Sequence, residues 1–167
     1  LVIAGANNSS LSVTNAGSYH VEVTQAGGCT GTSAAVIVST IALPVASISA
    51  GGPTTFCAGG SVLLTANSGS GFTYQWKKNG IVINGANGIS LSATSSGTYK
   101  CSVTNSSGCL RTSSGIIVTV NTLPTASITA AGNSNICAGD SVELIANAGT
   151  GLSYQWKKYA NNIVGST

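Results

Sequence analysis

Apolar and polar residues alternate over short stretches of this chain, and turn-forming residues interrupt the alternation roughly every 8 to 12 positions. A period of two places successive side chains on opposite faces of a β-strand, and no stretch carries the 3.6-residue period of an amphipathic helix. The pattern therefore predicts an all-β protein. In the best-defined part of the chain, the expected strands are Val45–Ala50, Ser61–Asn67, Thr73–Lys78, Ile81–Ile83, Ser90–Thr94, Thr98–Thr104 and Gly115–Val120.

The same pattern of residues recurs along the chain. FCAGGSVLL at Phe56 matches ICAGDSVEL at Ile136, and GSYHVEVTQAGGC at Gly17 matches GTYKCSVTNSSGC at Gly97, so the period is 80 residues (136 − 56 and 97 − 17). One supersecondary unit is therefore used repeatedly, as in tandem-repeat proteins. A unit of this size can bury a modest core of its own.

The period divides the chain into the C-terminal part of one repeat (residues 1–43), a complete repeat (residues 44–123) and the N-terminal part of the next (residues 124–167). Pro44 and Pro124 follow the last strand of each unit and cannot donate to a strand ladder, which indicates short, stiff junctions. Because the pattern starts and stops within a repeat, we expect an excerpt of a longer polypeptide. The alternative is a subunit whose two half-domains complete each other between neighbours in a filament.

Alternation within the complete repeat also predicts an inner face and its turns. Asn79-Gly80 is a strong signal for a two-residue hairpin, because both residues tolerate positive φ. Tyr159-Ala160 stands at the equivalent place in the third repeat, so that turn is expected to be built differently. The side chains expected to face inward are Ala46, Ile48, Val62, Leu64, Ala66, Tyr74, Trp76, Leu91, Ala93, Tyr99, Cys101, Val103, Ile116, Val118 and Val120.

Charged residues make up only 5% of the chain, so Ser, Thr, Asn and Gly supply most of its polar surface. The net charge is +3, and its lysines at Lys77, Lys78, Lys157 and Lys158 form no continuous basic stripe, which argues against nucleic-acid binding. No apolar run reaches the roughly 18 residues that a membrane span needs, so membrane insertion is not expected.

Groups that could carry out catalysis are scarce. The chain has one histidine, His20, and its only acidic side chains are Glu22, Asp140 and Glu143. No nucleophile, imidazole and orienting acid can be placed together, and the carboxylates are too few for calcium. We therefore predict that the protein is not an enzyme, and we expect neither a metal nor a cofactor.

Four of the five cysteines recur with the 80-residue period, Cys57 with Cys137 and Cys29 with Cys109. Within the complete repeat, a disulfide between Cys57 and Cys109 would close a loop of about 53 residues and contribute roughly 4 kcal/mol. Cys29 and Cys137 then need partners outside this stretch of sequence, or they pair between copies of the chain. Disulfides indicate an oxidising, extracytoplasmic compartment.

Trp76 and the later segment SSGTYKC, which ends at Cys101, resemble the immunoglobulin superfamily. The resemblance implies tandem immunoglobulin-like antiparallel β-sandwich repeats of about 80 residues. It makes Trp76 and Trp156 core anchors, and Tyr19 and Tyr99 tyrosine-corner residues. The first cysteine of the family pattern would fall near Ala66 and is absent. Cys101 is therefore expected to be a buried free thiol that acts as a small hydrophobe.

The ordered motifs CxGxSVxLxA, YQWKKNG, INGA and SGTYxxxVTNxxGC resemble the immunoglobulin-like repeats of large surface adhesins of gliding Bacteroidota. That resemblance covers essentially the whole chain and implies type IX secretion and display on the outer surface, with a role in adhesion or gliding. Asp140-Ser141-Val142 resembles the O-glycosylation acceptor of that group, which makes Ser141 a candidate site.

The sequence thus predicts a non-catalytic structural segment of an extracellular or cell-surface adhesin or filament. Its expected partners are the adjacent repeats of the same chain and other copies in a filament. The rival hypothesis is a carbohydrate-binding or accessory module that contacts surface polysaccharide. For such a module the core leaves only Phe56, Phe72 and Tyr159 as aromatic platforms, and the first two are replaced by Ile136 and Leu152 in the next repeat.

Overall fold

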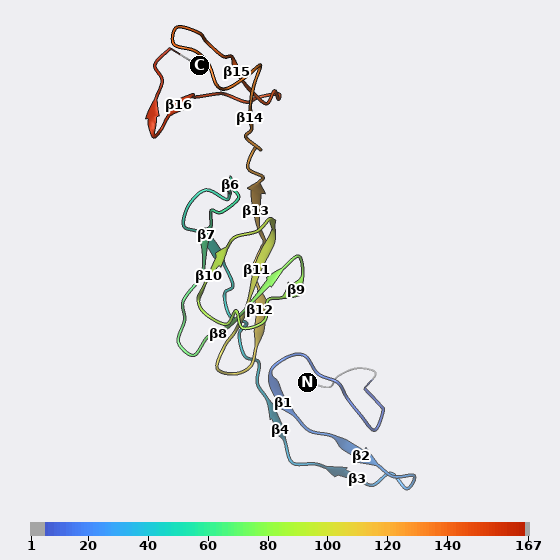
Figure 1. Cartoon of the computed structure of the whole chain (residues 1–167). Coiled ribbons are helices and arrows are strands. Elements are labelled where there is room, and N and C mark those ends of the chain that lie inside the picture. The colour runs from blue at the N-terminus through green and yellow to red at the C-terminus, as the bar shows by residue number, and fades with distance from the viewer. Residues whose placement is uncertain (1–5, 166–167) are drawn as a thin grey trace. The chain divides into compact units, whose positions relative to one another are not determined.

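The computed structural model describes residues 6–165, and every regular element within them is a β-strand (Figure 1). The all-β prediction is therefore confirmed. The chain divides into two compact units, of which the first ends at Asn121 and the second begins at Thr122. The expected boundary between residues 1–43 and residues 44–123 stays a prediction, because both segments belong to the first unit. Within the described residues, no helix is long and apolar enough to cross a membrane.

Residues 44–121 form a complete sandwich of two sheets. Every strand pair in it is antiparallel except β6 (Thr55–Cys57) with β13 (Ile116–Asn121), which is parallel. The first strand of the repeat, β5 (Ile48–Ala50), joins one sheet, and the next strand, β6, joins the other. The first sheet has the order β10 (Ser90–Ala93), β7 (Val62–Ala66) and β5 (Ile48–Ala50). The second has the order β6 (Thr55–Cys57), β13 (Ile116–Asn121), β11 (Gly97–Thr104), β8 (Thr73–Lys78) and β9 (Ile81–Val82), and β12 (Leu110–Thr112) also pairs with β11.

The core lies between these two sheets, and its largest fully buried side chains come from both. Leu64 is on β7, Trp76 on β8, Cys101 and Val103 on β11, and Val118 on β13. All the side chains that alternation placed on the inner face belong to this cluster or pack against it. Partly buried residues outside that prediction also pack against the cluster, namely Ala50, Phe56, Phe72, Ile83 and Ala86.

The flanking parts of the chain repeat pieces of this sandwich. In the first unit, β1 (Gly17–Tyr19) pairs with β4 (Val36–Val38) as β11 pairs with β13, and β2 (Glu22–Thr24) pairs with β3 (Thr30–Thr32) as β11 pairs with β12. In the second unit, β14 (Ile128–Ala130) pairs with β15 (Leu144–Ala146) as β5 pairs with β7. β16 (Lys157–Lys158) pairs with β17 (Asn161–Asn162) as β8 pairs with β9.

Two equivalent hairpins have different turns. Asn79 (φ 51°) and Gly80 (φ 85°) both adopt positive φ between β8 and β9, which confirms the predicted two-residue turn. In the second unit, Tyr159 has φ 56°, whereas Ala160 is not among the described residues with positive φ. That turn is thus built differently, as expected, and it holds a bulky side chain in a backbone region that such residues rarely adopt.

Candidate functional site

Tyr99 and Tyr19 occupy equivalent positions in the repeat and make the same hydrogen bond. The Tyr99 hydroxyl donates to the carbonyl oxygen of Ser95 at 2.9 Å, and the Tyr19 hydroxyl donates to that of Asn15 at 2.9 Å. A tyrosine hydroxyl bonded to the backbone a few residues upstream is the arrangement of a tyrosine corner. Each bond ties the beginning of a strand to the chain that precedes it.

Trp76 and Trp156 are also equivalent, but their surroundings differ. Trp76 is 0% exposed, and its Nε1 donates to the carbonyl oxygen of Gly88 at 2.9 Å. Trp156 is half-buried and lines an open hollow in the second unit. The same residue type is therefore a core anchor in the complete sandwich and part of an accessible surface in the second unit.

Cys101 lies in the centre of the complete sandwich and is 0% exposed. Burial raises the pKa of its thiol above the ordinary value, although a hydrogen bond with the backbone of Gln75 acts in the opposite direction. The protein interior therefore keeps Cys101 protonated, and a protonated buried thiol is a poor nucleophile. Cys101 is a free thiol within the described chain.

We expect the Cys101 thiol to resist labelling in the native protein, and we expect a stability effect at high pH. A thiol whose pKa is higher in the folded than in the unfolded state stabilises the fold below the unfolded-state value, and this contribution is lost as pH rises through the folded-state value. Above the ordinary thiol range, wild type should therefore lose stability relative to Cys101→Val, which carries the residue found at Val21. Parallel pH–stability curves for the two proteins would contradict the assignment.

Cys57 and Cys109 lie at opposite ends of the complete sandwich, which corrects the predicted disulfide between them. Cys57 pairs with Asn121 at the end of β13 that lies beside the start of β11. Cys109 lies in the loop that joins the end of β11 to β12. The length of β11 therefore separates them, about 25 Å at 3.3 Å per residue. A disulfide requires Cα atoms within about 7 Å.

The same geometry applies to the other two recurring cysteines, both of which are exposed and free. By the 80-residue equivalence, Cys29 corresponds to Cys109 and Cys137 to Cys57. If Cys29 and Cys137 belonged to one shared sandwich, the same distance would therefore separate them and prevent a disulfide. It stays a prediction that these two cysteines have partners outside this stretch of sequence.

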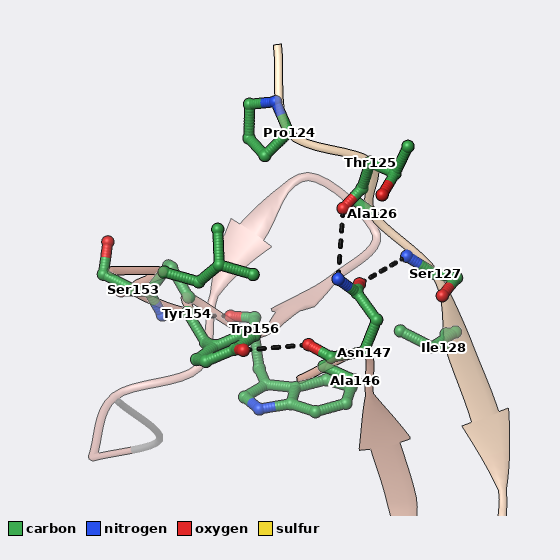
Figure 2. A pocket seen from close by; sticks show the side chains of 12 residues that line it. Pro124, Thr125, Ala126, Ser127, Ile128, Ala146, Asn147, Ser153, Tyr154 and Trp156 are labelled. Atoms are coloured by element: carbon green, nitrogen blue, oxygen red, sulfur yellow. Dashed lines mark hydrogen bonds between the residues drawn. The ribbon is translucent and has the colours of Figure 1, made fainter. Parts of the chain in front are cut away.

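Asn67 and Asn147 are recurring structural residues that the sequence interpretation missed. The Asn147 Oδ1 accepts from the Ser127 amide at 2.9 Å, and its Nδ2 donates to the Thr125 carbonyl oxygen at 3.2 Å (Figure 2). Asn67 makes the equivalent pair of bonds at 2.8 and 3.0 Å. The sequence did contain a signal for these residues, because the two asparagines lie one 80-residue period apart. Each asparagine fastens the start of its repeat just after the junction proline.

The second unit has an open hollow of about 360 Å³ that is bordered by this asparagine and by apolar side chains (Figure 2). Trp156 and Tyr154 contribute aromatic surface, and the Tyr154 hydroxyl donates to the Asn147 carbonyl oxygen at 2.8 Å. A second hollow of about 290 Å³ in the first unit is lined by β1, β4 and their neighbours. Its apolar lining residues are Leu11, Val13, Tyr19, Val21, Ala34, Val36 and Val38.

The two hollows correspond to the two halves of one core. In the second unit, the apolar lining residues Ile128, Ala146, Leu152, Tyr154 and Trp156 are equivalent to Ile48, Ala66, Phe72, Tyr74 and Trp76. In the first unit, Leu11, Val13, Tyr19, Val21, Val36 and Val38 are equivalent to Leu91, Ala93, Tyr99, Cys101, Ile116 and Val118. All of these equivalents belong to the core of the complete sandwich or pack against it. The hollows are therefore half-cores, and their shape needs no small-molecule ligand to explain it.

The remaining candidate groups do not gather into a chemical site. Among the described residues, no three His, Cys, Asp or Glu side chains lie close enough together to hold a metal ion. Phe56 and Phe72 pack against the core, whereas Tyr159 is 94% exposed. Ser141 is exposed on the segment before β15, and its glycosylation stays a prediction.

Comparison with known proteins identifies no family. No family model matches the chain, and no curated protein matches it. Among solved structures, the chain is similar to murine CEACAM1b, with 22% sequence identity and a TM-score of 0.41. The match covers 63% of this chain and 58% of that chain, so it spans less than two thirds of the solved protein. The sheet order and the core of the chain itself define it as an immunoglobulin-like β-sandwich protein.

Proposed function

We propose that this chain is a non-catalytic structural segment of an extracellular adhesin or surface filament, in which repeated sandwiches serve as a stalk or fibre. The observation that carries the proposal is the recurrence of one β-sandwich pattern every 80 residues, with equivalent tyrosine corners and equivalent asparagine clamps. Repeats of this kind extend a chain by stacking nearly identical units. Only 5% of the residues are charged, and the chain is rich in Ser, Thr and Asn, so neighbouring units repel each other little.

The structural role can be tested by pulling on the repeats. A protein made of tandem copies of residues 44–123 should unfold one repeat at a time under force. Each event should lengthen the chain by roughly 25 nm, because an extended residue spans at most about 3.6 Å and the folded repeat is short. Antibodies against the repeat should also label intact producing cells. Gradual extension without discrete events, or no surface labelling, would contradict the proposal.

The rival carbohydrate-binding role has a separate test. Tyr159 is the most exposed aromatic side chain of the described residues, and Phe56 and Phe72 are already used in packing. We expect no saturable signal for this chain on a glycan array. Saturable binding that is lost in Tyr159→Ala and retained in Val164→Asn would favour the binding module instead.

A further inference from the structure

The complete repeat carries a thiol near each of its two ends, and neither thiol has a partner within the repeat. Cys57 is exposed and Cys109 is half-buried. They are held apart by the length of β11, which is too far for a disulfide. The third cysteine of the repeat, Cys101, is sealed in the core. A partner for either end thiol must therefore come from outside the repeat.

Cys57 lies beside the linker that leaves the repeat. In the parallel pairing of β6 with β13, Cys57 is opposite Asn121, the last residue of β13. Backbones of paired strands lie about 4.8 Å apart. The Ala58 amide also donates to the Asn121 carbonyl oxygen at 2.8 Å, which fixes this contact beyond the end of β6. Cys57 is thus held against the last residue before Thr122, where the linker to the next repeat begins.

Cys109 lies beside the linker that enters the repeat. The Cys109 amide donates to the Asn105 Oδ1 at 2.9 Å, and the Asn105 amide donates to the Cys109 carbonyl oxygen at 3.0 Å. The Asn105 Nδ2 donates in turn to the carbonyl oxygen of Ala42 at 3.1 Å. Ala42 is the first residue of the linker Ala42-Leu43-Pro44. One asparagine side chain therefore ties the hairpin that contains Cys109 to the linker from the preceding repeat.

These two contacts fall on adjacent positions of the chain. By the 80-residue equivalence, Asn121 and Thr122 correspond to Ile41 and Ala42. Where two repeats join, the earlier repeat holds its Cys57 beside the first of these positions, and the later repeat binds the second with its asparagine hairpin. Consecutive Cα atoms are only about 3.8 Å apart. The end thiols of successive repeats are therefore tethered to the same short stretch of backbone.

The local structure around both kinds of end cysteine recurs in the flanking repeats. The Asp140 amide donates to the Cys137 carbonyl oxygen at 3.1 Å, which is the bond that the equivalent turn makes at Cys57. The Gln25 amide donates to the Cys29 carbonyl oxygen at 3.1 Å, as in the equivalent hairpin of the complete repeat. Each repeat part thus presents its end cysteine on the same turn, as a link repeated at every junction requires.

We propose that Cys57 of one repeat and Cys109 of the following repeat form a disulfide across the linker. The oxidant is a small disulfide such as oxidised glutathione. One protein thiol loses its proton, attacks this disulfide and releases one small thiol. The second protein thiolate then attacks the mixed disulfide and releases the other small thiol, so two protein thiols are oxidised as one small disulfide is reduced. The inference rests on the proposed structural role and adds a covalent link at each junction.

A protein with two consecutive copies of residues 44–123 tests the inference. This repeat builds its core from its own side chains, so it can be studied as a folding unit. With Cys101→Val in both copies, oxidised glutathione should link Cys57 of the first copy to Cys109 of the second. Peptide mapping after alkylation identifies the pair. Cys109 of the first copy and Cys57 of the second lie at the outer ends and should be alkylated, which provides an internal control.

The asparagine hairpin offers a matched pair of variants. Asn105→Ala in the second copy removes the contact that ties Cys109 to the linker. It should lower the equilibrium constant for the link roughly 3- to 10-fold in a glutathione redox buffer, as expected for one lost hydrogen bond. The same substitution in the first copy should leave the link unchanged, because that hairpin faces no earlier repeat. Equal effects of the two variants would exclude the proposed contact.

Force on a longer array gives a second readout. In the oxidised protein, the load on an interior repeat passes through the disulfides, so only residues 57–109 can lengthen. Each unfolding step should then be roughly 15 nm rather than 25 nm, because about 53 residues replace the whole repeat at no more than about 3.6 Å each. Reduction of the array should restore the longer step.

Three outcomes would overturn the inference: free thiols at the junction after oxidation, a link between Cys57 and Cys109 of one copy, or a step length that does not change on reduction. The proposed stalk is tested separately in the reduced array. Stepwise unfolding there would still support the stalk if no disulfide forms, whereas gradual extension of the reduced array would contradict the stalk itself.

Discussion

Replacing Trp76 with alanine is expected to lower the free energy of unfolding of the complete sandwich by about 3–5 kcal/mol. Trp76 is 0% exposed and fills the space between the two sheets, so its removal leaves a cavity that the surrounding strands cannot close. The substitution also removes the indole donor from the Gly88 carbonyl oxygen. The loss should therefore reach the upper part of the range for a large core residue.

The buried Cys101 thiol provides the measurement, because a reagent reaches it only when the sandwich opens. With the other cysteines replaced by serine, the labelling rate of Trp76→Ala should exceed that of wild type by a factor between roughly 100 and several thousand, since about 1.4 kcal/mol corresponds to tenfold. Trp156→Ala is the matched control and should leave Cys101 labelling unchanged, because Trp156 belongs to the other unit. An increase below tenfold for Trp76→Ala would contradict its role as the core anchor.

Removing the side chain of Asn67 is expected to cost about 1–2 kcal/mol and to release the start of the repeat. Its Oδ1 accepts from the Ser47 amide at 2.8 Å, and its Nδ2 donates to the Val45 carbonyl oxygen at 3.0 Å. Alanine can replace neither bond. The chain just after Pro44 would then keep the bond from the Asn67 amide to the Ser47 carbonyl oxygen, at 3.1 Å, and the short ladder between β5 and β7.

Hydrogen exchange at the Ser47 amide measures this effect locally. Exchange should become faster in Asn67→Ala, while amides in the centre of β11 should change much less. Asn67→Asp is the matched variant, because it keeps the acceptor for Ser47 and loses the donor to Val45. It should therefore fall between wild type and Asn67→Ala. Equal protection of Ser47 in all three proteins would show that the side chain does not fasten this segment.

The strands of the complete sandwich followed closely from the sequence, and the exceptions have a physical reason. Alternation predicted Thr73–Lys78 with the bounds that the structure shows, and every predicted inward-facing residue lies in or against the core. β6 was missed, because it has only three residues and is held by a parallel partner far away in the chain. β12 was missed because its three residues are all exposed and so show no alternation between an inner and an outer face.

The candidate site was harder to predict than the fold. Recurrence identified Cys57 and Cys109 as a pair, but spacing along the chain contains no information on which end of a sandwich each residue occupies. The pairing of β6 with β13 places Cys57 at one end, and the loop after β11 places Cys109 at the other. Likewise, Trp76 and Trp156 look equivalent in the sequence, and only packing shows that one is sealed while the other borders an open half-core.

By itself, the sequence determined the repeat, the all-β class, the inner face of each strand and the positive-φ turn at Asn79-Gly80. These features depend on local periodicity and on the conformational freedom of single residues, which a sequence displays directly. The tertiary structure decided which strands meet and which cysteines are kept apart. Those properties depend on contacts between segments distant in the chain, and equivalent residues acquire different surroundings when the strands that would cover them differ.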